Sequence, residues 1–375
     1  MKILKTLSIL IVIAIVVFGC VNNKKEEVIK IGVILPLSGD VAVYGKSLQN
    51  GLDLALGKYM KENPLKMKVK LIYEDSKADP KIAVSSMQKL TTVDKCNIVL
   101  GGFSSSEVLS IAPIAEKNKV VLISPTASSP NVTNAGDYIF RITPSDNFDG
   151  EIMARFAYKE LNLRNVALIF SNNDYGLGIS KVFVSKFISL GGKISVQKSF
   201  ESGVNDFKPQ LTSIKEAKPD GIYIIAAGEI GIILKQKSEI NLINTKTFTV
   251  GLAENPKTIE IAGNAANYVY YSYPAFQVNS DNATIKNFVA DYKSKFSKEP
   301  DVLVAYGYDL MNITLSVLEN NFESSDKIKN ALYRIKNFSG ITGQTSFDKN
   351  GDVTKSAGIK VIKQGKFEWY INNFN

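Results

Sequence analysis

Short apolar runs alternate with segments whose apolar residues recur at helical spacing, and this order predicts strands that alternate with helices. Val28 to Leu35 is a β-branched run of strand length, and the apolar residues between Ser47 and Glu62 fall on one helix face. A second helix is expected from Pro80 to Leu90, beginning at Asp79, a residue type that caps helices. Further strands are expected at residues 67–75, 97–101, 120–124 and 138–142. Such a series is typical of a parallel sheet with helices on both faces.

The series begins again after Pro144, which predicts a second sheet built in the same way. Strands are expected at residues 166–171, 193–200, 220–227, 247–251 and 268–273. Helices are expected at residues 149–161, 178–190, 207–216, 228–240, 283–296 and 302–320. The chain after Gly340 adds only two strand-like runs, 358–362 and 367–371. We expect these runs to complete the existing lobes rather than to form a third domain.

The composition fits an ordinary globular protein of two domains. The chain has 375 residues, of which 45% are hydrophobic, and a mean hydropathy of +0.00, so it can form large buried cores. Its net charge of +9 comes mostly from lysines that are scattered along the chain. Because no dense basic run interleaved with aromatic residues is present, nucleic acid is not an expected partner.

The sequence contains no histidine, which excludes several kinds of catalytic and metal site. Nucleophilic arrangements with a histidine base and zinc sites with histidine ligands both require an imidazole. The two cysteines, Cys20 and Cys96, cannot form a Cys-x-x-Cys redox pair or a cysteine metal cluster. We therefore expect neither a metal nor a cofactor, and Cys96 is most simply a small buried apolar residue.

The first 19 residues have the composition of an export signal. Two lysines precede the apolar run Leu7 to Phe18, which is shorter than the roughly 20 residues of a membrane-spanning helix. The sequence VVFGC at the end of this run resembles a lipobox, which predicts lipid modification of Cys20, with residues 20–27 as a polar tether. An uncleaved N-terminal anchor is the alternative. Both interpretations place the rest of the chain outside the cytoplasmic membrane, anchored to its outer face.

Two turns rich in serine and threonine follow two predicted strands in the stretch GGFSSSEVLSIAPIAEKNKVVLISPTASSP, residues 101–130. If these strands are parallel neighbours, both turns lie at the edge where open α/β sheets bind ligands. Backbone N–H groups and hydroxyls at that edge suit an anion such as a carboxylate. Without a histidine base, Ser104, Ser105 and Ser106 fit helix capping better than nucleophilic catalysis, and capping is compatible with ligand binding. The stretch therefore predicts half of a small-molecule cleft.

The segment GDVAVYGKS, residues 39–47, lies between a strand and a helix, as a nucleotide-binding P-loop does. Five residues separate Gly39 from Gly45, whereas the P-loop has four between these glycines. We therefore do not expect nucleotide binding.

Several acids and tyrosines lie beside predicted strand ends and turns, where they could contact a ligand. An acid there can pair with an ammonium group, although solvated and capping roles are more common. A tyrosine can form an aromatic wall or face a cation, although core packing is more common. The acids are Glu74, Asp75, Glu254 and Asp309, and the tyrosines are Tyr44, Tyr175 and Tyr306.

Four stretches together resemble the branched-chain amino acid binding proteins of ABC transporters. They are IKIGVILPLSGDVAVYGKSLQNGLDLAL, the 101–130 stretch, VALIFSNNDYGLGI and DVLVAYGYDLMNIT, and the likeness runs from about Lys30 to Gly365 through FDKNGD at 347–352. The resemblance implies the type I periplasmic binding protein fold, an α/β fold of two Rossmann-like lobes with parallel-sheet cores joined by three crossovers. It implies a first lobe of residues 28–143 and 252–356, and a second of residues 144–251 and 357–375.

The same resemblance implies the residues of the ligand cleft. Ser104 with the backbone around Ser105, and Thr126 with Ala127 and Ser128, occupy the positions that hold an α-carboxylate. The other positions lining the cleft fall on Tyr44, Tyr175, Leu303 and Tyr306.

Several positions depart from the family pattern, and one of them concerns the amino group of the ligand. Glu254 is the acid nearest to the family's ammonium-binding position, but it falls one or two residues late. Ala226 and Ala227 stand where relatives often have a tyrosine. These departures leave amides, ureas and carboxylates without an amine open as ligands.

The resemblance implies a monomeric lipoprotein, not an enzyme, that captures an amino acid by hinge closure and delivers it to an ABC permease. One alternative is a sensory protein that binds amides, urea or small carboxylates and signals to a membrane receptor. A more distant alternative is an extracellular enzyme that uses serine, lysine and carboxylate side chains.

Overall fold

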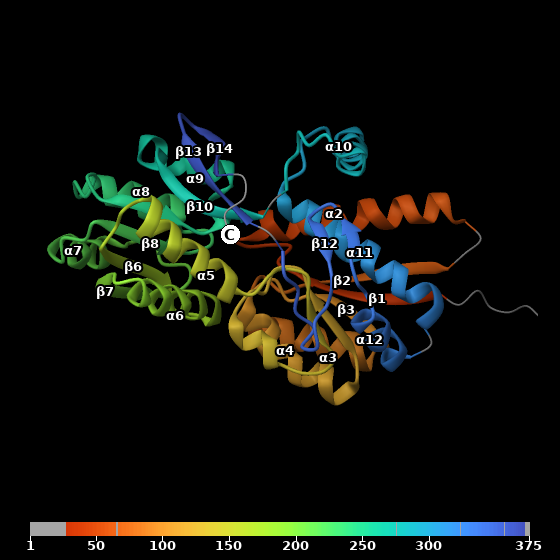
Figure 1. Ribbon diagram of the computed structural model, residues 1–375. Coiled ribbons are helices and arrows are strands. Elements are labelled where there is room, and N and C mark those ends of the chain that lie inside the picture. The colour runs from red at the N-terminus through yellow and green to blue at the C-terminus, as the bar shows by residue number, and fades with distance from the viewer. Residues whose placement is uncertain (1–27, 65–66, 275, 323, 356, 372–375) are drawn as a thin grey trace, which may run out of the picture.

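The computed structural model describes residues 28–64, 67–274, 276–322, 324–355 and 357–371, and shows two α/β lobes side by side (Figure 1). The expected signal peptide, the tether and Cys20 lie outside the described residues. Within the described part of the chain, none of the helices has the length and apolar character needed to span a membrane.

The first lobe contains a parallel sheet with the strand order β2-β1-β3-β4-β5. Its strands are β1 (Val28–Leu35), β2 (Lys68–Asp75), β3 (Ile98–Gly101), β4 (Val121–Ser124) and β5 (Ile139–Arg141). Its helices are α2 (Ala42–Glu62), α3 (Pro80–Thr92), α4 (Ser105–Asn118), α10 (Ala283–Phe296), α11 (Val302–Asn321) and α12 (Ser325–Tyr333). A 3₁₀ turn at Pro130–Asn134 and a small hairpin of β11 (Phe338–Gly340) and β12 (Gly343–Thr345) complete it.

Alternate residues of β1 enter different cores, as expected for a strand covered on both faces. Val33 and Leu35 pack in the core that contains residues of α2 and α11. Ile34 packs in the core that contains residues of α3 and α4. The β-branched run at 28–35 is therefore a central strand between two helical layers.

The second lobe contains a seven-stranded sheet with the order β14-β13-β10-β9-β8-β6-β7. Its strands are β6 (Asn165–Ser171), β7 (Lys193–Phe200), β8 (Gly221–Ile225), β9 (Lys246–Thr249), β10 (Val269–Pro274), β13 (Ala357–Lys363) and β14 (Lys366–Ile371). Its helices are α5 (Asp146–Arg155), α6 (Asp174–Ser189), α7 (Lys208–Glu216), α8 (Ile230–Glu239) and α9 (Pro256–Ala262). The strands from β10 to β7 are parallel, whereas β13 and β14 are antiparallel additions at one end.

Helix starts follow local capping signals that are visible in the sequence. Asp79 caps α3 as predicted, because its carboxylate accepts hydrogen bonds from the amides of Lys81 and Ile82. Asn173 and Asp301 cap α6 and α11 in the same way. These caps fix where each helix begins relative to the strand before it.

The helix α2 begins earlier than its apolar spacing predicts, at Ala42 rather than Ser47. Gly45 lies in its first turn, and a Cβ atom there would be 1.9 Å from the Pro36 carbonyl oxygen. The glycine that made residues 39–47 similar to a P-loop therefore allows a helix to pack closely on the end of β1.

The expected lobe boundary at residue 252 is wrong. The strand β10 pairs with β9 and β13 in the second sheet, and α9 packs against α8 of the second lobe. The chain returns to the first lobe only between Pro274 and Ala283. The three crossovers thus lie between β5 and α5, between β10 and α10, and before β13, which confirms the expected fold class.

Two further differences concern short elements. The helix expected at 149–161 begins at Asp146 and ends in a π-helical turn, Phe156–Glu160. The helices α9 and α12 were not expected, because segments of seven and nine residues are too short for a distinct apolar period.

Candidate functional site

The two serine- and threonine-rich turns lie at one edge of the first sheet, because β3 and β4 are parallel neighbours. The Thr126 hydroxyl donates a 2.6 Å hydrogen bond to the Phe103 carbonyl oxygen. The Ser129 amide donates a 3.1 Å hydrogen bond to the Ser105 hydroxyl. These bonds join the turn after β3 to the turn after β4, so the two turns form one surface.

Ser104 begins α4 in a capping box with Glu107. Its hydroxyl accepts from the Glu107 amide at 3.2 Å, and the Glu107 carboxylate accepts from the Ser104 amide at 2.7 Å. Ser104 and Thr126 are partly exposed, whereas Ser105 and Ala127 are buried. Ser104 and Thr126 therefore offer the accessible hydroxyls of this surface, and Ser105 and Ala127 support it from below.

Ser128 connects this surface to the first crossover between the lobes. Its carbonyl oxygen accepts a 2.7 Å hydrogen bond from the Asp146 amide, at the start of α5. Its hydroxyl interacts with the Asp146 carboxylate. These two contacts connect the turn after β4 to the segment that crosses between the lobes for the first time.

A buried arginine, which the sequence analysis did not single out, supports the second turn. Arg141 is 1% exposed, and its guanidinium donates to both carboxylate oxygens of Asp352, at 2.6 and 2.8 Å. The same guanidinium donates to the carbonyl oxygen of Ser129 at 2.9 Å and to the hydroxyl of Thr133 at 2.8 Å. Asp352 belongs to the FDKNGD turn, which the sequence pattern indicated. Nothing in the sequence pattern indicated that Arg141 is its partner.

The lobes touch directly beside the first turn. The Ser106 hydroxyl donates a 2.8 Å hydrogen bond to the carboxylate of Asp174, the first residue of α6, and accepts one from its amide. A Cβ atom on Gly178 would lie 2.9 Å from the Ser129 hydroxyl oxygen. The N-terminus of α6, including the partly buried Tyr175, thus lies against the two turns.

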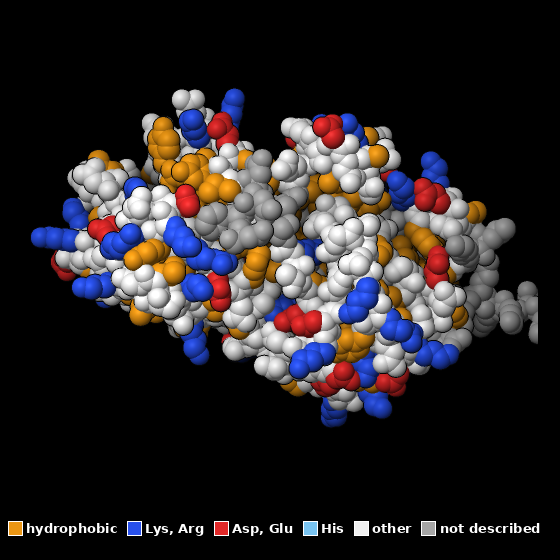
Figure 2. All heavy atoms as spheres, in the orientation of Figure 1, with side chains coloured by type: hydrophobic (Ala, Val, Ile, Leu, Met, Phe, Trp, Pro, Cys, Tyr) orange, Lys and Arg blue, Asp and Glu red, His pale blue; other side chains and the backbone are white. Residues whose placement is uncertain are grey.

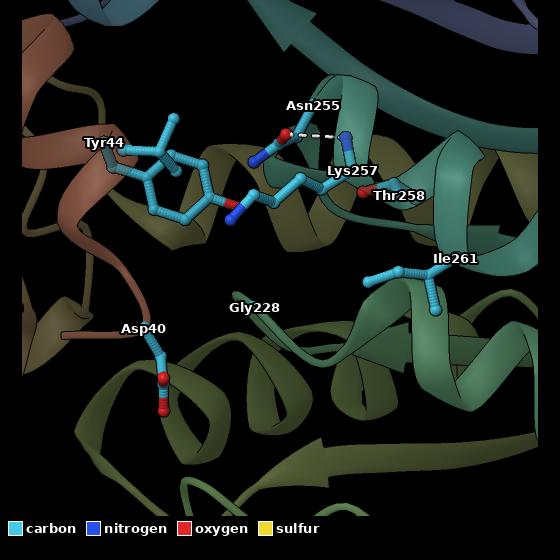
Figure 3. Close-up of a pocket in the computed structure, with 8 residues that line it drawn as sticks. Asp40, Tyr44, Gly228, Asn255, Lys257, Thr258 and Ile261 are labelled. Carbon is cyan, nitrogen blue, oxygen red and sulfur yellow. Dashed lines mark hydrogen bonds between the residues drawn. The ribbon is translucent and has the colours of Figure 1, made fainter.

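Tyr44 reaches from the first lobe to the second at another point. Its ring is stacked on Phe103, with 5.8 Å between centroids, and its hydroxyl donates to the Leu252 carbonyl oxygen at 3.4 Å. A pocket lies beside it between the lobes, and Figure 3 shows the tyrosine extending toward Asn255 and Lys257. The pocket is lined by Asp40, Val43 and Tyr44 of the first lobe and by Gly228, Asn255, Lys257, Thr258 and Ile261 of the second.

Three other residues that were expected to line the cleft differ in their burial. Leu303 and Tyr306 begin α11 and are buried in the first lobe. Ala227 is partly exposed after β8, next to Gly228 of the pocket. The position where relatives often have a tyrosine is thus occupied by a small side chain beside the pocket.

Glu254 is already paired within the second lobe. Its carboxylate accepts hydrogen bonds from the Lys360 ammonium at 2.6 Å and from the Tyr271 hydroxyl at 2.7 Å. The Lys360 ammonium also lies over the rings of Tyr273 and Trp369. Because Lys360 neutralises this carboxylate, Glu254 lacks the free charge expected of an ammonium partner.

The other acids considered from the sequence have structural partners. Asp75 accepts from the amides of Leu37 and Lys77, and so shapes the turn before α2. Asp309 accepts from the amides of Ile341 and Thr342, at 2.7 and 2.8 Å. Glu74 pairs with Lys89 on the surface.

Two acids that the sequence analysis did not select lie in the first turn of α5. Asp146 is 3% exposed and Asp149 is partly buried. Burial, and then the nearby Asp149 carboxylate, raise the pKa of Asp146 to about 8, while Ser128 and Arg141 lower it. Burial also raises the pKa of Asp149, which interacts with Ser272 of β10. These carboxylates lie at the junction of both lobes.

Residues 28–366 match the family model of periplasmic binding proteins. This chain belongs to the periplasmic binding protein family. The family consists of extracytoplasmic binding proteins rather than enzymes, and the fold shown in Figure 1 is that of its type I members.

Solved structures of ABC transporter binding proteins are similar over nearly the whole chain. The leucine-binding protein LivK of Thermotoga maritima has a TM-score of 0.86 at 31% identity, covering 92% of this chain and 99% of that chain. LivJ of Streptococcus pneumoniae in complex with isoleucine has a TM-score of 0.84 at 29% identity, covering 91% and 98%. A solute-binding protein of Rhodopseudomonas palustris in complex with 3,4-dihydroxybenzoic acid has a TM-score of 0.81 at 26% identity, covering 92% and 96%. The chain is therefore an ABC transporter solute-binding protein.

Replacing Arg141 by methionine should lower the free energy of unfolding by about 3–5 kcal/mol, because it leaves the largely buried Asp352 carboxylate without its cation and removes the bonds of the guanidinium to Ser129 and Thr133. Denaturant unfolding followed by circular dichroism measures this loss. Lys286→Met is the matched control, because the Lys286–Asp281 pair is on the surface and its removal should change stability little. Equal effects of the two substitutions would contradict a special role for the buried pair.

The binding protein without ligand should become less stable as the pH rises from about 4 to about 8. An unfolded aspartate has a pKa of about 3.9, whereas Asp146 has a pKa of about 8 in the folded protein. Between these values the folded state holds an additional proton on this group, so stability falls as the pH rises. Calorimetric melting of Asp146→Asn should therefore show a smaller decrease over this range. A decrease equal to that of the unmodified protein would contradict the raised pKa.

Proposed function

We propose that this protein captures a branched-chain amino acid between its lobes and delivers it to an ABC permease. The observation that carries the proposal is the single surface formed by the turns after β3 and β4, with the accessible hydroxyls of Ser104 and Thr126. The Ser104 hydroxyl, as a donor, and the N-terminus of α4 replace the water that a carboxylate loses on burial. The LivK and LivJ proteins, named for leucine binding and bound to isoleucine respectively, support the choice of ligand class.

The contacts between the lobes support a closure mechanism. The ligand would bind first to the turns of the first lobe, and rotation at the three crossovers would bring Tyr175 and the Ala227 region over it. The hydrogen bonds between Ser106 and Asp174 connect opposite lobes, so they can form only when the lobes approach. The permease would recognise the surface that both lobes present together.

The anchor belongs to the same proposal. The signal sequence and the lipobox ending at Cys20 support a lipoprotein held at the outer face of the cytoplasmic membrane by residues 20–27. We expect detergent extraction of membranes to release a protein that begins at Cys20 and carries lipid, as measured by intact mass. A soluble protein whose Cys20 thiol is unmodified would contradict the anchor.

Ser104→Ala combined with Ser128→Ala should weaken binding of L-leucine at least tenfold, which corresponds to a loss of about 1.4 kcal/mol. The reason is that the accessible Ser104 hydroxyl is removed together with the Ser128 hydroxyl, which the family resemblance assigns to the carboxylate and which interacts with Asp146 beside it. Isothermal titration calorimetry with L-leucine measures the dissociation constant. Ser110→Ala is the control, because that hydroxyl lies in the same helix and donates only to the Ser106 carbonyl oxygen. An unchanged dissociation constant in the double variant would remove these residues from the site.

A further inference from the structure

We propose that Asp146 and Asp149 form the cation subsite of the cleft and hold the ammonium group of the bound amino acid. The inference rests on the proposed function and assigns the amino group to residues other than Glu254. Both acids lie in the first turn of α5, directly after the first crossover. Residues three apart on a helix lie on the same face, so the two carboxylates point in similar directions.

The position of the acid pair suits a ligand whose carboxylate lies on the first lobe. Ser128 touches Asp146 through both its carbonyl and its hydroxyl, so the pair adjoins the proposed carboxylate surface. Asp149 interacts with Ser272 of β10, in the second sheet. An α-amino acid carries its ammonium and its carboxylate on one carbon atom. A cation subsite must therefore adjoin the carboxylate subsite, as this pair does.

Unpartnered polar atoms provide an independent indication of a ligand. Within the described residues, Oδ2 of Asp146 and the hydroxyl of Tyr223 are buried without a hydrogen-bond partner. Tyr223 is fully buried and Asp146 is 3% exposed. Buried polar atoms are almost always paired, and leaving them unpaired is unfavourable. These two acceptors come from α5 and β8, and an ammonium group has N–H donors to offer to both.

The tyrosines lie close enough to the acids to respond to their charge. Burial raises the pKa of Tyr223, and the Asp149 carboxylate raises it further. The pKa of Tyr306 is raised mainly by burial, and Asp149 is among the charges that raise it further. The same carboxylates raise the pKa of the buried Tyr175 hydroxyl. The charges of the acid pair therefore act on tyrosines of both lobes.

The acid pair has no ion-pair partner in the described part of the chain. No ion pair there includes Asp146 or Asp149, and Arg141, whose charge acts on Asp146, is bound to Asp352. Glu254, in contrast, is neutralised by Lys360. Metal binding is a poor alternative, because the described residues contain no group of three acidic, cysteine or histidine ligands. An ammonium ion would favour the ionised forms of both acids, which burial disfavours in the empty protein.

The test compares three probes that share one branched chain. L-leucine carries both charged groups, 4-methylpentanoate carries only the carboxylate, and 3-methylbutylamine carries only the ammonium. Calorimetric dissociation constants are measured for the unmodified protein, Asp149→Asn, Asp146→Asn and the matched control Glu254→Gln. We expect either aspartate substitution to reduce the preference for L-leucine over 4-methylpentanoate at least tenfold, and the control to change it less than threefold.

A stability measurement without ligand separates a binding role from a structural one. Asparagine keeps the shape of the side chain and removes an acid whose ionised form burial disfavours, so Asp149→Asn should melt at the same temperature as the unmodified protein or higher. A lower melting temperature together with an unchanged preference would show a structural role and overturn the inference.

The remaining outcomes distinguish this inference from the proposed function. Tight binding of L-leucine with no change in preference in either aspartate variant would overturn the cation subsite and leave the proposed function standing. Equal affinity of the unmodified protein for L-leucine and 4-methylpentanoate would do the same. Binding of 3-methylbutylamine without binding of L-leucine would support the subsite and overturn the proposed function. Binding of none of the three probes would overturn both.

Discussion

The buried pair of Arg141 and Asp352 is the interaction on which the cleft depends. Arg141 ends β5 just before the first crossover, and Asp352 lies in the turn just before the third. The guanidinium has five donors in a rigid fork, so it can hold both carboxylate oxygens and still donate to the Ser129 carbonyl oxygen of the second turn. One side chain thus ties two of the three connections between the lobes to the turn that is proposed to hold the ligand. A turn fixed in this way loses little conformational freedom when a ligand binds.

The cleft contains two kinds of polar group. Neutral hydroxyls lie on the turns, and acids without ion-pair partners lie on α5. The turns after β3 and β4 offer hydroxyls, and the hydroxyls of Ser105 and Thr126 are also used to join the turns. The acids lie beside them, at Asp146 and Asp149, where burial makes negative charge unfavourable in the empty protein. Such unfavourable arrangements are typical of functional sites, because a ligand of the opposite charge relieves them.

The contacts between the lobes are of a kind that can open and close. The bonds of Ser106 with Asp174, and of Tyr44 with Leu252, join partly buried groups that water can satisfy when the lobes separate. Exchange with water makes the net contribution of each bond small, about 0.5–1.5 kcal/mol. The cores of the two lobes are separate clusters of buried apolar residues, so rotation at the crossovers need not disturb them.

The sequence by itself determined what depends on neighbouring residues: the alternation of strands and helices, the Asp79 cap, the capping role of Ser104 and the two turns at one sheet edge. These features follow from period and capping within a few residues. Only the tertiary structure decided that β10 joins the second sheet and that Glu254 is neutralised by Lys360, 106 positions away. It also joined Arg141 to Asp352, 211 positions away, and buried Asp146 between the lobes. Burial and ion pairing depend on which distant segments pack together, and local sequence does not carry that information.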